Sequence, residues 1–285
     1  MSDGRLWATS DLHVGYQENR EILTQRLVPR SPDDWLIVAG DVAEKAEDVL
    51  WALGVLAGRF ARVIWAPGNH ELWTPQKDPV QLRGRARYEH LVAACRSLGV
   101  LTPEDDYPTW TGPGGPVTVV PMLLLYDYSF RPAHVPTAAA ALQIAYDAGV
   151  VATDEFLLHP DPYPDRPSWC AERVAATEAR LAELPAGTRT VLVNHFPMTR
   201  LPTRILRHPE FSIWCGTDRT ADWHTRFAAA AVVYGHLHIP RTTYEDGVRF
   251  EEVSLGYPRE WKRHGMRRGL LREVFPDVDP VPESW

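Results

Sequence analysis

Short apolar runs alternate with helix-length amphipathic segments along most of the chain. The apolar runs end at Gly, Pro or Asp, and they predict buried strands over 6–9, 35–39, 63–66, 117–121, 190–194, 232–234 and 248–253. Residues 44–59 place Val49, Leu53 and Leu56 at helical spacing, with charged residues on the opposite side. This alternation predicts an α/β domain in which helices cover a sheet. Ligands of such sheets bind beyond the carboxyl ends of the strands, so we look for functional residues among the polar residues there.

The segment 122–185 departs from this rhythm. It contains an alanine-rich predicted helix at 137–148, a proline-rich stretch at 160–164 and a second predicted helix at 168–184. We interpret it as an insertion that borders the active site within a single domain over 1–275. The tail at 276–285 is acidic and rich in proline, which predicts irregular structure.

Composition limits the classes of protein and the compartment. The 285 residues include 30 Lys and Arg against 37 Asp and Glu, a formal charge of −7, which argues against a surface built throughout for nucleic acid. No run approaches the roughly 18 apolar residues of a membrane span, and the first residues lack a signal-peptide pattern. Three cysteines without a CxxC pair disfavour a disulfide scaffold or a thiolate zinc site. We therefore expect a cytoplasmic enzyme that uses neither membrane nor nucleic acid, beyond a nucleotide as substrate.

Five short polar motifs follow predicted strands. Each is weak alone, but together they offer two carboxylates, one amide oxygen and four imidazoles, about the number of ligands that two adjacent divalent ions need. This mix of oxygen and nitrogen suits Mn, Fe, Zn or Ni without choosing among them. Glycines at 40, 68 and 235 fit loops whose backbone approaches the ions closely. The seven candidate ligands are Asp11, His13, Asp41, Asn69, His195, His236 and His238.

The ordered motifs resemble those of the calcineurin-like metallophosphoesterases over residues 6 to about 253. The resemblance implies two packed mixed β-sheets flanked by helices. It also makes His70 a catalytic residue that protonates or stabilises the leaving oxygen, and not a ligand. By the same resemblance, the ligands of one ion are Asp11, His13 and His238, those of the other are Asn69, His195 and His236, and the shared ligand is Asp41.

Further segments resemble the actinobacterial 4′-phosphopantetheinyl hydrolases, which remove the phosphopantetheine arm from acyl carrier proteins. They are residues 31–35, 84–88, 125–130, 152–156 and 256–261. This likeness implies hydrolysis of a phosphodiester by a metal-activated hydroxide that attacks phosphorus, with an acyl carrier protein as partner. Two alternatives stay open: a phosphoesterase for a nucleotide, another small phosphodiester or a phosphoprotein, and a non-catalytic scaffold, which would not need a complete ligand set.

Several residues have both a functional and a structural interpretation. The basic segment 259–272 is either a solvated surface strip or a dock for an acidic carrier protein. Glu71 is expected to support a ligand or the backbone near it. We expect Asp222 to open a helix and His224 to be exposed, with no role in the site. The candidate substrate contacts are Tyr126, Tyr128, Trp261, Arg263 and Arg267.

Overall fold

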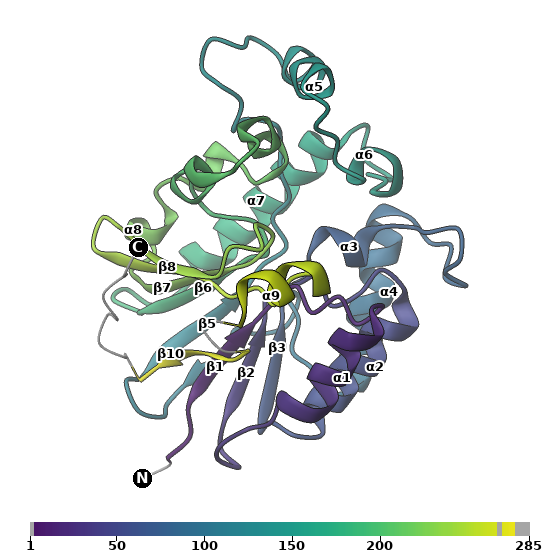
Figure 1. The fold of residues 1–285 in the computed structure, drawn as a ribbon. Helices are drawn as coiled ribbons and strands as arrows, with labels where there is room; N and C mark the ends of the chain where they lie inside the picture. The colour runs from purple at the N-terminus through teal and green to yellow at the C-terminus, as the bar shows by residue number, and fades with distance from the viewer. Residues whose placement is uncertain (1–2, 267–269, 277–285) are drawn as a thin grey trace.

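Two mixed β-sheets pack face to face in the computed structural model, which describes residues 3–266 and 270–276 (Figure 1). The strands are β1 (Leu6–Thr9), β2 (Trp35–Val38), β3 (Arg62–Trp65), β4 (Thr109–Trp110), β5 (Val117–Pro121), β6 (Thr190–Val193), β7 (Ala229–Tyr234), β8 (Arg241–Glu245), β9 (Val248–Glu252) and β10 (Arg272–Phe275). The strand orders are β10-β1-β2-β3 and β4-β5-β6-β7-β9-β8. The inner strands run parallel, and β10, β4 and β8 pair antiparallel at the edges.

Burial on both faces explains why β2 and β7 are continuous apolar runs. One set of side chains, including Ala8, Ile37 and Val191, packs between the two sheets. The alternate set, including Leu36 and Trp65, belongs to a second cluster under the helices. A half-exposed sheet would instead show alternating polar positions.

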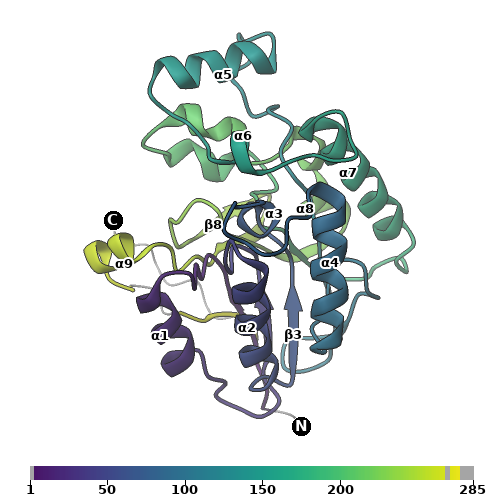
Figure 2. The same cartoon turned by 90° about the vertical axis from the view of Figure 1, so that its right-hand side faces the viewer.

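Helices cover the outer faces of the two sheets. α1, α2 and α4 lie over the first sheet, whereas α7 and α8 lie on the side of the second (Figures 1 and 2). The α-helices are α1 (Gln17–Arg26), α2 (Ala46–Ala57), α3 (Asn69–Leu72), α4 (Gly84–Ser97), α5 (Ala138–Asp147), α6 (Asp154–Leu157), α7 (Arg166–Ala182), α8 (Trp223–Arg226) and α9 (Pro258–His264). Short 3₁₀ helices cover η1 (Leu201–Ile205), η2 (Pro209–Trp214) and η3 (Asp218–Thr220). The predicted α/β class with two packed mixed sheets is confirmed.

The segment 122–185 has two parts with different surroundings. α5 and α6 rise above the carboxyl ends of the strands, and α6 lies beside α3 in both views (Figures 1 and 2). A bridge between Trp73 and Leu158 joins these two regions. α7 instead packs its buried residues, Trp169, Val174 and Leu181 among them, into the main core. The predicted irregular tail falls almost wholly on 277–285, outside the described residues.

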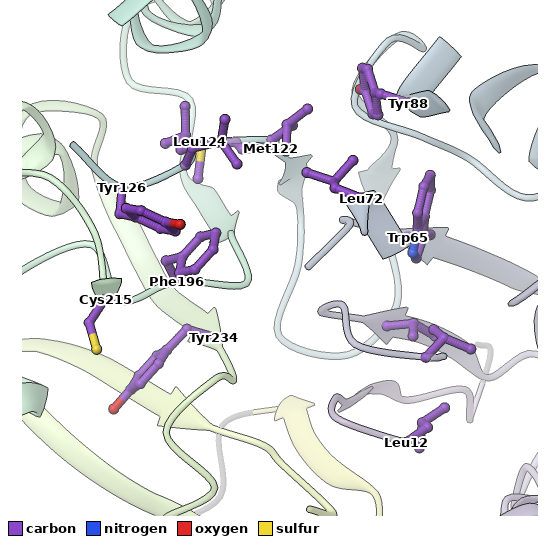
Figure 3. Close-up of a cluster of buried hydrophobic side chains, with 14 of the residues drawn as sticks. Leu12, Trp65, Leu72, Tyr88, Met122, Leu124, Tyr126, Phe196, Cys215 and Tyr234 are labelled. Atoms are coloured by element: carbon purple, nitrogen blue, oxygen red, sulfur yellow. The ribbon is translucent and has the colours of Figure 1, made fainter. Parts of the chain in front are cut away.

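The core also fixes the loops that follow the strands. Leu12, Leu72 and Phe196 are fully buried in one hydrophobic cluster, and each is the chain neighbour of a residue that the sequence singles out (Figure 3). A side chain anchored in the core on one side of a polar residue restricts where that polar residue can point. Among the described residues, no helix combines the length and apolar character needed to cross a membrane.

Candidate metal centre

The seven predicted ligands converge beyond the carboxyl ends of β1, β2, β3, β6 and β7, which belong to both sheets. Their ligand atoms form compact groups within 4.8 Å. One group joins Asp11, His13 and His238, another joins Asp41, His195 and His236, and a third joins His13, Asp41 and His70. The first two groups contain residues that the family resemblance assigns to the two ions, whereas the third brings His70 within the same distance of His13 and Asp41.

In the first group, three lone-pair donors face one point. His238 Nε2 lies 3.0 Å from Asp11 Oδ1 and 3.3 Å from His13 Nε2. The other ring nitrogen of His238 donates to Glu260 Oε2 at 2.7 Å, so a neutral ring turns its lone pair toward Asp11. Such a meeting of acceptors needs a cation between them, either a proton or a metal ion.

The second group repeats this arrangement. His195 Nδ1 donates to the Ala39 carbonyl at 2.8 Å, which directs Nε2 at Asn69 Oδ1, 3.1 Å away, and at Asp41 Oδ2, 3.3 Å away. His236 adds a buried Nε2 that has no hydrogen-bond partner within the described part of the chain. Burial lowers the pKa of His195, but the charge of Asp41 outweighs burial and raises that pKa to about 10. The oxygen and nitrogen atoms that meet here therefore fit divalent ions.

Backbone strain concentrates on these same residues. Asp11, His13, Asp41, His236 and His238 all have positive φ, between 42° and 71°. Non-glycine residues seldom adopt this region because Cβ crowds the backbone, and such strain clusters at functional sites. Among the described residues, only three other non-glycine positions share it. The coincidence of strained backbone with the candidate ligands supports a functional role for these loops.

Two of the predicted glycines give the ligands room. A Cβ on Gly68 would lie 2.1 Å from Asp41 Oδ1, and a Cβ on Gly235 would lie 2.2 Å from Asp11 Oδ2. No rotamer change at Asp41 or Asp11 relieves such overlap without moving the ligand atom itself. The close approach of backbone that the sequence predicts is therefore present.

His70 stands beside both ligand groups. Its backbone N–H donates to Asp41 Oδ1 at 3.0 Å, and its ring lies on Trp73 with centroids 3.7 Å apart. Nδ1 donates to Glu44 Oε1 at 3.1 Å, which leaves Nε2 facing the ligands, 3.6 Å from Asp41 Oδ2. Burial lowers the pKa of His70, but Asp41 and Glu44 outweigh it and raise that pKa. The ring is thus held where it can carry a proton.

A profile of the calcineurin-like phosphoesterases matches residues 4–240. The chain belongs to the calcineurin-like phosphoesterase family. It is 60% identical over 277 residues to "[Acyl-carrier-protein] phosphodiesterase PptH" of Mycobacterium tuberculosis (strain ATCC 25618 / H37Rv), covering 97% of this chain and 85% of that protein. The crystal structure of phosphopantetheinyl hydrolase (PptH) from Mycobacterium tuberculosis superposes with a TM-score of 0.96 at 58% identity, over 99% of both chains.

Three carboxylates that sequence reasoning left without a role hold candidate ligands or His70 in place in this phosphoesterase. Glu44 and Glu260 hold His70 and His238, as described above. Asp154, from the predicted insertion, accepts a hydrogen bond from Asn69 Nδ2 at 2.8 Å and another from Trp73 Nε1 at 2.7 Å. This contact turns the amide of Asn69 so that Oδ1 faces His195. The only earlier signal is that Asp154 and Glu260 lie in segments that resemble phosphopantetheinyl hydrolases.

Glu71 has the supporting role that the sequence indicates. Its carboxylate accepts hydrogen bonds from the backbone N–H of Asp41 at 2.9 Å, of Val42 at 2.9 Å and of Gly68 at 3.0 Å. It thereby ties the loop after β2 to the loop after β3. Burial first, and then Asp41, raises the pKa of Glu71 to about 7.

The aromatic residues predicted to contact substrate are mostly buried. Tyr126 is 0% exposed, and Tyr128 donates from its hydroxyl to Glu155 at 2.8 Å. Trp261 is partly buried, and its Nε1 donates to Asn19 Oδ1 at 2.9 Å, which holds α9 against α1. Because Tyr126 has no exposed surface and its ring contacts Tyr128 and Phe196, it offers no free ring face for stacking on a substrate.

The remaining predictions divide between surface and core. Arg263 is exposed on α9, whereas Arg267 lies outside the described residues. His224 is not exposed as expected: it is 1% exposed, and its Nε2 lies 3.0 Å from Asp246 Oδ2. The short helix that follows Asp222 turns this imidazole inward, where it packs on Phe250. The three cysteines are buried and free.

Proposed function

We propose that this phosphoesterase is a dinuclear, metal-dependent phosphodiesterase that removes 4′-phosphopantetheine from acyl carrier proteins. The convergence of seven oxygen and nitrogen ligands beside His70 supports the phosphodiester chemistry. One observation carries the substrate: the chain is 60% identical, over 97% of its length, to a protein named as an acyl-carrier-protein phosphodiesterase. In this proposal residues 1–275 form one domain, and 122–185 is its insertion.

The metal ligands in this proposal are those of the two groups, with Asp41 shared between them. Two divalent transition-metal ions, of Mn, Fe, Zn or Ni, would supply an activated water and a positive field around the phosphate. The imidazole ligands add no negative charge when neutral, so they preserve that field. Glu260, Asp154 and the Ala39 carbonyl fix the orientation of three ligands before substrate arrives.

His70 is the proposed proton donor to the leaving group. In the reaction, the bond between phosphorus and the serine oxygen of the carrier breaks, and water supplies the new oxygen on phosphorus. The serine oxygen gains a proton, and the phosphate stays on the pantetheine arm. His70 Nε2 faces the site while Nδ1 is held by Glu44, so the ring is oriented to deliver that proton.

A cytoplasmic location is part of the same proposal. The three cysteines, Cys95, Cys170 and Cys215, are unpaired and buried, as suits a reducing compartment.

Mass spectrometry of a holo acyl carrier protein, incubated with the enzyme and Mn²⁺, tests the substrate directly. The expected result is loss of the arm from the carrier and appearance of 4′-phosphopantetheine. Hydrolysis of bis-p-nitrophenyl phosphate in the same preparation reports a working metal centre. An unchanged holo carrier beside an active generic phosphodiesterase would reject the carrier substrate and favour a nucleotide or another small phosphodiester.

A further inference from the structure

A pocket of about 480 Å³ opens next to the metal centre, between the start of α1 and the start of α9. Its volume falls within the roughly 300–1,000 Å³ that is typical of small-molecule sites. The metal ligands and His70 do not line it, so it is additional to the reacting centre. The lining residues are Tyr16, Gln17, Glu18, Tyr257, Pro258 and Arg259.

Tyr257 connects this pocket to the ligands of the first ion group. Its ring stacks on His13, with centroids 4.4 Å apart and planes at 26°, and meets His238 edge-on at 4.8 Å. Glu260 fixes the connection, because its Oε2 accepts from both the Tyr257 backbone N–H at 2.9 Å and His238 Nδ1 at 2.7 Å. The wall of the pocket therefore packs directly against the candidate metal ligands, and Glu260 holds both in place.

A row of rings continues from the pocket past the catalytic imidazole. The centroids of Tyr16 and Tyr257 are 5.6 Å apart, and His13 and His70 follow at 4.7 Å from each other. Trp73 completes the row beyond His70. The row therefore links the wall of the pocket to His70 through the buried ring of His13.

The mouth of the pocket offers aromatic rings, hydrogen-bonding groups and one cationic side chain, Arg259. Tyr16 is 49% exposed, and the Arg259 guanidinium lies 5.3 Å from the centre of the Tyr257 ring. Glu18 pairs with Lys262 at 2.5 Å, which offsets its negative charge. Rings and hydrogen-bonding groups of this kind accommodate amides and hydroxyls. A folded protein would require several hundred Å² of matching surface, which a concave pocket of this size does not offer.

We propose that this pocket holds the pantetheine arm, the part of the substrate that keeps the phosphate after cleavage. This inference rests on the proposed function, and it places Tyr16 and Arg259 as binding residues for the amide chain. Tyr257 is unsuitable for a test, because its ring also packs on the candidate ligand His13.

The test measures how much the arm adds to binding of phosphate. Inhibition of bis-p-nitrophenyl phosphate hydrolysis is measured with 4′-phosphopantetheine and, separately, with inorganic phosphate. In the wild type, 4′-phosphopantetheine should inhibit at least about tenfold more tightly than phosphate. Tyr16→Ala and Arg259→Ala should each reduce this ratio roughly three- to tenfold. Because both inhibitors meet the same metal centre, the ratio cancels any general change in activity.

Tyr244→Ala is the matched control, since Tyr244 is also 49% exposed but lies on the edge strand β8. It should leave the ratio unchanged. A ratio near one in the wild type, or a ratio that neither pocket variant lowers, would overturn the arm-binding role. The two proposals fail separately: a holo carrier that keeps its arm rejects the substrate, whereas a carrier that loses its arm with a ratio insensitive to both variants rejects only the pocket.

Discussion

Asn69 shows how the orientation of a single amide decides whether a site can bind a cation. Its Oδ1 can face His195 only because Nδ2 donates to Asp154, which is itself buried and bonded to Trp73. Turned by half a rotation, the amide would present N–H groups to the ion. Asp154 is therefore a positioning residue that acts through Asn69, although it lies 85 residues further along the chain.

We expect Asp154→Ala to lower turnover roughly 10- to 100-fold, with loss of metal from the group that contains Asn69. Metal content per chain, measured by mass spectrometry after dialysis, should fall toward one ion while the variant stays folded. Asp154→Asn, which keeps an acceptor oxygen, should recover part of both losses. Asp147→Ala, on exposed α5, is the control. Full occupancy and full turnover in Asp154→Ala would reject the positioning role.

His70 should behave in the opposite way. His70→Ala removes a proton donor but no ligand, so it should leave metal content intact and lower turnover at least about tenfold. The loss should be larger for a poor alkoxide leaving group, as in a holo carrier, than for p-nitrophenolate, which leaves without a proton. Metal analysis and turnover of both substrates check this. Equal turnover of the holo carrier by variant and wild type would remove His70 from the mechanism.

At the scale of elements, the strands that carry the ligands were predictable and the supporting contacts were not. Burial on both faces makes β1 and β5 apolar apart from one threonine each, and their predicted bounds are correct. β8 was not predicted, because its sequence, Arg-Thr-Thr-Tyr-Glu, is polar and only partly buried at a sheet edge. Metal chemistry restricts ligands to a few residue types, so spacing identifies them. A supporting carboxylate such as Glu44 resembles any loop acid until the topology brings His70 beside it.

The turn between β3 and α3 offers a test of close approach. Gly68→Ala places a Cβ 2.1 Å from Asp41 Oδ1, so we expect displacement of the shared carboxylate and a fall in metal affinity of at least roughly tenfold. Gly54→Ala in α2 is the matched control, because its Cβ would make only ordinary contacts with Leu98 at 3.7 Å. That control should bind metal normally and gain about 0.5–1 kcal/mol of stability. Metal titration and thermal unfolding of both variants check this. Normal metal affinity in Gly68→Ala would show that the close approach to Asp41 does not require a glycine.

For the whole molecule, the metal centre joins the two sheets, because one group takes Asp41 from the first sheet and His195 and His236 from the second. Ions bound there should stabilise the native state by mass action, by about 2.7 kcal/mol at a concentration 100 times the dissociation constant. A chelator should therefore lower the melting temperature and abolish turnover, and added Mn²⁺ should restore both. A preparation that retains its activity and melting temperature in excess chelator would contradict a metal-dependent site.

The net charge of the whole chain affects how an acidic carrier protein can approach it. A chain with a formal charge of −7 repels an acidic carrier protein at long range, so productive encounter needs a local basic surface near the site. α9 provides one, since it carries Arg259, which lines the pocket, and Lys262 and Arg263, which follow it along the helix. We expect Arg263→Glu to reduce kcat/KM for a holo carrier at least about tenfold at low salt, and less as salt rises, because screening weakens charge steering. Arg62→Glu is the control, because Arg62 is the first residue of β3 and the candidate ligands lie beyond the other end of that strand. Hydrolysis of bis-p-nitrophenyl phosphate should be insensitive to both changes. An equal loss on the carrier and on the small substrate would show that Arg263 acts on the reacting centre instead of on docking.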